Sequence, residues 1–296
     1  MTIEKVEFES EGRTLRGWLT LPAGAGPHPA VVMSAGFAGV KEGFLGHPYH
    51  HVLAEAGVAT LLYDHANCGE SDGEPRQELD PLLQQRGYRD AVTFLAGSDD
   101  IDADRLGIWG TSYSGGHVLG VAAADRRVRC VVSQAMTISG HSNLLRRHTP
   151  ASYAALRRSW ADDRLARARG AAPATVPAFA EDSDSVRFAM SRPPEHRANW
   201  RNEVTVRSWE LYDEYEPAAF IERISPTPLL MIVGVDDVMT PAEDALAAYN
   251  RALEPKKLLL IPGGHYAAYT DHFALTSAAA RDWFVEHLSR WSGAAR

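Results

Sequence analysis

The sequence predicts an α/β domain with a mostly parallel central sheet, and three observations support this fold class. First, short apolar runs alternate with amphipathic, helix-like segments once the chain has passed residue 21. Second, the runs AVVMSAG (30–36) and VATLLYD (58–64) are continuously apolar, which is typical of strands buried on both faces of a parallel sheet. Third, the alternation of strand and helix patterns returns near the C-terminus.

The first half of the chain follows this alternation closely. Residues 3–9 and 13–21 alternate around Glu11-Gly12 and predict an N-terminal β-hairpin. Six further elements are expected in order: a strand over 30–36, a helix over 47–57, a strand over 58–64, a helix over 81–97, a strand over 106–110 and a helix over 113–124. A strand over 128–135 completes this half.

The alternation breaks between residues 138 and 220. This segment is rich in Arg, Ala, Asp, Glu and aromatic residues, and its clearest element is a helix over 151–170. The pattern then resumes with a strand over 227–234, a helix over 241–253, a strand over 257–263 and a final helix at about 271–290. We therefore predict one core, made of residues 1–137 and 221–296, that carries a helical lid inserted at 138–220.

Composition excludes several classes of partner. The formal net charge of −8 argues against nucleic-acid binding, which needs a concentration of Lys and Arg. Charged residues from Glu4 onward interrupt any signal-peptide pattern, and no apolar run reaches the ~20 residues that span a bilayer. We expect a cytoplasmic protein with no membrane partner, whose cysteines, Cys68 and Cys130, are reduced thiols. The oligomeric state, including a homodimer, is left open by the sequence.

The stretch RLGIWGTSYSGGHVL (105–119) carries the first candidate catalytic residue. Ser112 follows an expected strand and precedes an expected helix, as the nucleophile does in the strand-turn-helix motif G-x-S-x-G. Ser114 stands where that motif has its last glycine, and we expect it to serve as a small residue that lets helix and strand approach. Because such matches also arise by chance, Ser112 could instead cap the following helix.

Two later loops supply the partners that a catalytic serine needs. A base must take the serine proton and a carboxylate must orient that base, and both should follow later strands in the order serine, acid, histidine. GVDDVMTP offers Asp236 and Asp237 after the strand at 227–234, and IPGGHYAAY offers His265 after the last strand. His272 competes for the role of base, but we place it inside the final helix. Three placements in the correct order favour a catalytic triad.

With these residues in place, the chain resembles the α/β-hydrolases, and within them the dienelactone-hydrolase and polyketide-transferase-like group. The segments that carry the resemblance are GPHPAVVMSAGFAGVKE, LLYDHANCGESDGEPR, IWGTSYSGGHVLGVAAADRRVRCVVSQA, DDVMTP and PGGHYAAY. They cover the main domain almost end to end, whereas the lid is not matched. The resemblance implies an α/β-hydrolase fold and an elbow of the form G-T-S-[FY]-x-G-G, in which a serine at position 114 is an accepted variant.

The resemblance also implies roles for individual residues. Its acid loop, G-x-x-D-x-x-[TV]-P, places the acid at Asp237 and leaves Asp236 as a supporting or solvent-facing carboxylate. The oxyanion hole is expected to use the backbone N–H groups of Tyr113 and Phe37. Many relatives have His-Gly-Phe in the loop that corresponds to residues 35–37, and here Ala35 stands in place of the histidine. A backbone donor tolerates that change.

These observations predict a serine hydrolase that forms an acyl-enzyme on Ser112 and cleaves a carboxylic ester, lactone or thioester without a cofactor or metal. The substrate is expected to be a small acyl compound. Aromatic residues of the lid are candidates for its pocket, namely Trp160, Trp200, Trp209 and Tyr212.

Three alternatives stay open. An acyltransferase of polyketide-transferase type would use the same acyl-enzyme with an alcohol or amine as acceptor. A peptidase or amidase for short peptides would need a pocket for the peptide amine, which acidic lid residues could supply. A non-catalytic ligand-binding protein could retain the fold.

Two other groups of polar residues are interpreted as structural. His47, His50, His51 and His65 suggest a metal site, but no Cys or carboxylate completes a clear ligand set, so a hydrated helix start is the better interpretation. Asp64, at the end of its strand, is expected to organise neighbouring loops.

Overall fold

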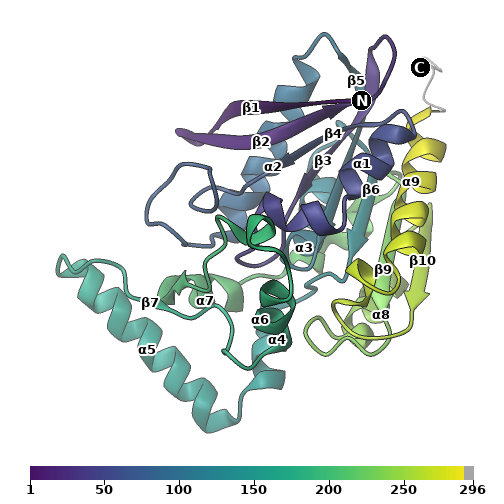
Figure 1. Ribbon diagram of the computed structural model, residues 1–296. Helices are drawn as coiled ribbons and strands as arrows, with labels where there is room; N and C mark the ends of the chain where they lie inside the picture. The colour runs from purple at the N-terminus through teal and green to yellow at the C-terminus, as the bar shows by residue number, and fades with distance from the viewer. Residues whose placement is uncertain (290–296) are drawn as a thin grey trace.

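An eight-stranded sheet forms the centre of the computed structural model, which describes residues 1–289 (Figure 1). The strand order is β1-β2-β4-β3-β5-β6-β9-β10, in which β1 and β2 are antiparallel and the strands from β4 to β10 are parallel to one another. The strands are β1 (Thr2–Ser10), β2 (Arg13–Leu21), β3 (His28–Ser34), β4 (Ala59–Tyr63), β5 (Ile101–Thr111), β6 (Val128–Gln134), β9 (Leu229–Gly234) and β10 (Lys256–Ile261). The predicted α/β-hydrolase fold class, including its N-terminal hairpin, is confirmed.

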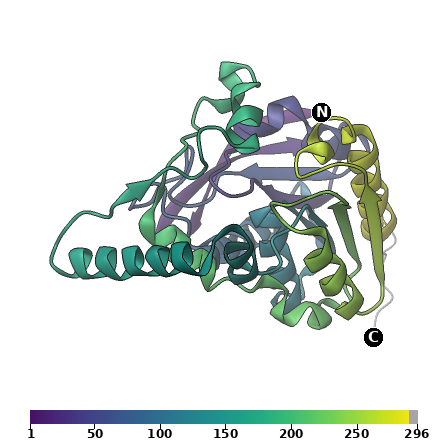
Figure 2. The same cartoon turned by 90° about the horizontal axis from the view of Figure 1, so that it is seen from below.

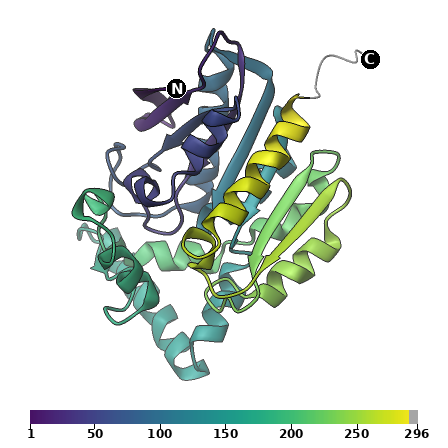
Figure 3. The same ribbon diagram turned by 45° about the vertical axis from the view of Figure 1, so that its right-hand side comes forward.

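Helices cover both faces of the sheet, as Figure 3 shows. One face packs against α2 (Pro81–Ala96), α3 (Tyr113–Ala124), η3 (Pro217–Ile224) and α8 (Ala242–Arg251), and the other against α1 (Tyr49–Glu55) and α9 (Phe273–Ser289). Strand β3 explains its own continuous apolar run, because Val32 faces the first cluster while Val31 and Met33 face the second. Because both faces of the sheet are buried at β3, its side chains do not alternate between apolar and polar.

Local sequence signals account for where these helices begin. Asp80 caps α2 by accepting hydrogen bonds from the N–H groups of Leu82 and Leu83, at 2.9 and 3.1 Å, and Pro81 occupies the first helical position. Most predicted boundaries move by one or two residues, and β5 moves furthest. β5 begins at Ile101, five residues before the predicted start, and the sequence pattern missed this part because residues 102–105 are mostly polar and are exposed or half-buried. Helix α9 begins at Phe273, and the predicted last residue of that helix, 290, lies outside the described residues.

The inserted segment leaves the sheet after β6 and returns before β9. Its elements are α4 (Gly140–Arg147), α5 (Pro150–Ala168), β7 (Thr175–Val176), α6 (Asp184–Met190), η2 (Pro194–Arg197), β8 (Val204–Thr205) and α7 (Val206–Asp213). Figure 2 shows α5 extending away from the sheet, and only Trp160 and Asp163 of this helix are buried. Within residues 1–289, no helix combines the length and apolarity needed to cross a membrane.

Candidate active site

Ser112 lies in a strained turn between β5 and α3. Its backbone has φ 56° and ψ −117°, a conformation that is costly for a residue with a side chain and that clusters at functional sites. The turn is tight enough that a Cβ on Gly110 would collide with the carbonyl of Ser114. Although Ser112 occupies the N-cap position of α3, its side chain makes no capping hydrogen bond. Its Oγ lies 3.0 Å from Nε2 of His265 instead.

His265 and Asp237 lie in the loops after β10 and β9, so the ends of three parallel strands converge on one point. Nδ1 of His265 is 2.7 Å from Oδ2 of Asp237, and both side chains are buried. Burial opposes ionisation of Asp237, but the charge and hydrogen bond of His265, together with hydrogen bonds from Thr240, outweigh it and lower the pKa of Asp237. An ionised Asp237 accepts a hydrogen bond from the Nδ1–H group of His265, which leaves Nε2 unprotonated and free to accept the proton of Ser112.

The two other candidates for acid and base take different positions. Asp236 is exposed, and its Oδ2 accepts a hydrogen bond from the Gly263 N–H at 3.1 Å. It therefore ties together the loops after β9 and β10. His272 precedes α9 by one residue, contrary to its predicted place inside that helix, and does not contribute to the cavity beside Ser112.

The loop after β3 brings a second backbone segment to the serine. A Cβ on Gly36 would lie 2.8 Å from Cβ of Ser112, so only glycine allows this approach. Within residues 1–289, neither the Phe37 N–H nor the Tyr113 N–H has a hydrogen-bond acceptor. Two unpaired donors therefore flank the Ser112 turn, one on each segment.

Ser114 does more than provide a small side chain, because it contacts His65, which the sequence had grouped with other histidines at a helix start. The buried Ser114 hydroxyl donates to the carbonyl of Ala35, and Nε2 of His65 lies 2.8 Å from Ser114 Oγ. Burial lowers the pKa of His65 to about 3, so the ring is neutral. Because the only Ser114 proton goes to Ala35, His65 Nε2 is the donor in the second bond. This network ties the Ser112 turn to the loop after β3.

A cavity opens onto Ser112 and is walled mainly by aromatic and other apolar side chains. These are Phe37, Val40, Phe44, Phe179, Phe188, Trp200, Trp209, Tyr212, Met239, Tyr266 and Tyr269. Of the four predicted pocket residues, Trp200, Trp209 and Tyr212 line it. The structure corrects the prediction for Trp160, which packs in an apolar cluster with Tyr212 because α5 lies against α7 at that point.

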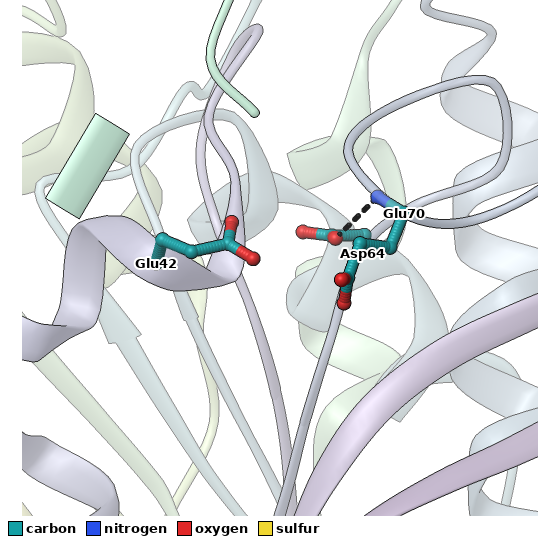
Figure 4. A group of neighbouring side chains, drawn as sticks. All are labelled: Glu42, Asp64 and Glu70. Atoms are coloured by element: carbon teal, nitrogen blue, oxygen red, sulfur yellow. Dashed lines mark hydrogen bonds between the residues drawn. The ribbon is translucent and has the colours of Figure 1, made fainter. Parts of the chain in front are cut away.

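One group of carboxylates lies outside the cavity and close enough together to hold a cation. Among residues 1–289 it consists of Glu42, Asp64 and Glu70, shown in Figure 4, where the Glu70 N–H donates to Asp64. The buried ammonium of Lys41 already lies 2.9, 2.7 and 2.6 Å from their oxygens. Burial opposes the charge of Lys41, but the carboxylates outweigh it and raise its pKa. The group therefore fits an ammonium, and Asp64 also accepts the backbone N–H of Lys41 at 2.8 Å.

Comparison with known proteins places this geometry in context. The chain is similar to the polyketide transferase grgF of a Penicillium species, with 32% identity over 274 residues and 88% of each chain covered. It is equally similar to the thiohydrolase aneE of Aspergillus aculeatus, with 32% identity over 306 residues, 98% of this chain and 92% of the relative.

Solved structures agree with these relatives. The α/β-hydrolase GrgF from a Penicillium species superposes with a TM-score of 0.83 at 29% identity, covering 98% of this chain and 100% of that one. DcsB, solved in complex with its substrate analogue, superposes with a TM-score of 0.87 at 25% identity, covering 97% and 100%. The model of the X-Pro dipeptidyl-peptidase (S15) family matches residues 11–267. Because this match spans most of the sequence, the chain belongs to the X-Pro dipeptidyl-peptidase (S15) family of α/β-hydrolases.

Proposed function

We propose that this enzyme cleaves carboxylic ester, lactone or thioester bonds through an acyl-enzyme on Ser112. Its family and relatives are those of acyl-bond hydrolases and transferases. The observation that carries the finer proposal is the hydrogen-bonded chain Ser112–His265–Asp237, with distances of 3.0 and 2.7 Å.

The geometry supports a stepwise mechanism. Ser112 Oγ attacks the acyl carbonyl while His265 Nε2 takes its proton, a contribution worth roughly 10²- to 10⁴-fold in rate. The N–H groups of Phe37 and Tyr113 stabilise the oxyanion, by about 3 kcal/mol for each donor. His265 returns the proton to the leaving group and then deprotonates a water. That water attacks the acyl carbonyl, and the bond to Ser112 Oγ then breaks as His265 returns the proton to Oγ and the acid leaves. Asp237 stabilises the imidazolium each time it forms.

The lining of the cavity favours an acyl substrate over a peptide. Within the described part of the chain, no Asp or Glu lines the cavity, so no carboxylate there pairs with a peptide amine. The aromatic wall instead suits an apolar acyl chain. Because α6, Trp200 and Trp209 supply part of that wall, we propose that residues 138–220 act as a lid over Ser112.

Acyl transfer is the second candidate, favoured by the printed names of relatives such as the polyketide transferase grgF. An alcohol or amine would take the place of water in the second half-reaction. Both candidates share the acyl-enzyme and differ only in what resolves it.

A panel of acyl substrates tests the proposal. Wild-type protein is incubated with p-nitrophenyl esters, N-acetylcysteamine thioesters and dipeptidyl p-nitroanilides, with and without an acceptor alcohol, and products are identified by mass spectrometry. We expect ester or thioester cleavage that Ser112→Ala abolishes. The control Ser159→Ala, at an exposed position on α5, should retain wild-type rates. Preferential anilide cleavage, or full activity in Ser112→Ala, would contradict the proposal, and a transfer product would select the second candidate.

A further inference from the structure

The cavity beside Ser112 is positively charged in a protein whose net charge is −8. Three arginines line it, Arg147, Arg192 and Arg197, and none of the lining residues in the described part of the chain is acidic. The catalytic mechanism uses none of these arginines. Their presence in a largely aromatic cavity therefore requires another explanation.

Arg192 is the arginine most firmly held in position. Its Nη2 donates to Nδ1 of His47 at 3.1 Å, and its Cζ lies 4.4 Å from the ring centroid of Phe188. Gly46 lets the guanidinium pass, because a Cβ at that position would collide with Nη1. The contacts come from η1 (Lys41–Gly46), the residue after it, and α6, so both walls of the cavity orient the group.

These contacts position the charge of Arg192 without neutralising it. Among residues 1–289, no carboxylate forms an ion pair with Arg192, and burial lowers its pKa. His47 cannot compensate, because burial, followed by the charge of Arg192, lowers the pKa of His47 to about 3 and keeps the ring neutral. By contrast, Arg187 on α6 is exposed and pairs with Asp184. Arg192 is half-buried, so its charge is partly withdrawn from water without a counter-charge, and an anionic ligand would offset the cost of that.

Arg197 extends the same feature. It belongs to η2, which packs against η1, and its Nε is buried without a hydrogen-bond acceptor within residues 1–289. Two guanidinium groups with unused donors thus line the cavity into which Ser112 opens. Planar guanidinium groups bind carboxylate and phosphate through paired hydrogen bonds.

We propose that the cavity binds an anionic group of the acyl substrate at Arg192, with Arg197 beside it. The inference rests on the proposed function, because it assumes that the acylating substrate occupies this cavity. The anion can be a carboxylate at the far end of the acyl chain or a phosphate on the leaving thiol, and both present the same oxygens to a guanidinium.

Binding measurements test the anion site independently of chemistry. Calorimetry compares adipamic acid with heptanamide for the acyl side, and phosphopantetheine with pantetheine for the thiol side. We expect the anionic member of one pair to bind roughly 10- to 100-fold more tightly. Arg192→Met, which keeps the side-chain stem, should remove that preference, Arg192→Lys should keep part of it, and the control Arg187→Met should leave it intact. Equal binding within both pairs, or equal loss of both members in Arg192→Met, would overturn the proposal.

Turnover separates this proposal from the proposed function. In wild type and in Arg192→Met, we measure the ratio of kcat/KM for the adipoyl over the heptanoyl thioester of N-acetylcysteamine. The same ratio is measured for hexanoyl-phosphopantetheine over hexanoyl-pantetheine. An anion preference of about tenfold or more that Arg192→Met removes supports the inference. Ser112-dependent cleavage without any anion preference refutes the inference alone. Tight anion binding at Arg192 without Ser112-dependent cleavage refutes the proposed function alone.

Discussion

Replacing Asp237 with Asn should nearly abolish activity, whereas the same change at Asp236 should have little effect. The two carboxylates are adjacent in sequence and identical in chemistry. Only Asp237 is buried and lies 2.7 Å from Nδ1 of His265, while Asp236 is exposed and accepts from the Gly263 N–H. The pair therefore forms a matched comparison within one loop.

The hydrogen bonds of Asp237 determine the size of the effect. Its Oδ1 accepts from the N–H groups of Met239 and Thr240 at 2.8 and 2.9 Å, so an asparagine must place its oxygen there. The amide NH₂ then faces His265, whose Nδ1 must accept rather than donate. Nε2 carries the ring proton in that tautomer and cannot take the proton of Ser112. Loss of the correct tautomer costs about 10⁴-fold in kcat, or about 5.5 kcal/mol of barrier.

Asp236→Asn preserves what Asp236 does, because an amide oxygen can accept from Gly263 as well. We expect its kcat to stay within about twofold of wild type, as for other exposed substitutions. Both variants are assayed on one activated ester, with circular dichroism to verify folding. A larger loss in Asp236→Asn than in Asp237→Asn, or an Asp237→Asn enzyme within tenfold of wild type, would refute the reasoning.

Three further predictions concern stability and positioning. Ser114→Ala removes two buried hydrogen bonds and leaves Nε2 of His65 without its partner. It should lower the free energy of unfolding, measured by urea titration, by about 1–3 kcal/mol. It should also reduce kcat more than it changes KM. An unchanged kcat would show that the contact between Ser114 and Ala35 does not position the loop after β3, which carries the Phe37 N–H. Gly110→Ala should cost about 3 kcal/mol or more because its Cβ meets backbone, while Gly97→Ala, with 3.6 Å to its nearest neighbour, should be nearly neutral. Because the pKa of Asp237 is lowered in the fold, its ionisation stabilises the protein above the unfolded value of about 3.9, and that contribution is lost as pH falls below it. Asp237→Asn should therefore lose less stability than wild type between neutral pH and about pH 3, and equal losses would contradict this.

The sequence could predict the positions of Ser112, Asp236, Asp237 and His265 because each follows a recognisable apolar strand. Parallel strands end at one edge of the sheet, so residues far apart in the chain converge there. The choice between the two aspartates needed the spacing of a known family. In the structure the two differ in burial and in contact with His265, and neither property can be obtained from the adjacent letters DD.

Other features depend on contacts that no local pattern encodes. His65 pairs with Ser114 across 49 residues, and Lys41 is enclosed by the carboxylate of its neighbour Glu42 and by two carboxylates of the loop after β4. Trp160 packs in an apolar cluster rather than in the cavity because α5 lies against α7, and the number of aromatic residues in the segment does not predict this. The position of Arg192 in the cavity wall depends on its hydrogen bond to the neutral His47, which lies more than 140 residues away in the sequence.

The proposed mechanism requires Ser112 to be the nucleophile. A fluorophosphonate probe added to the folded wild-type protein, followed by peptide mass spectrometry, measures this directly. We expect one stoichiometric adduct on the peptide that contains Ser112, absent in Ser112→Ala and greatly slowed in Asp237→Asn. A folded protein that stays unlabelled at Ser112, or that is labelled at another serine, would contradict it.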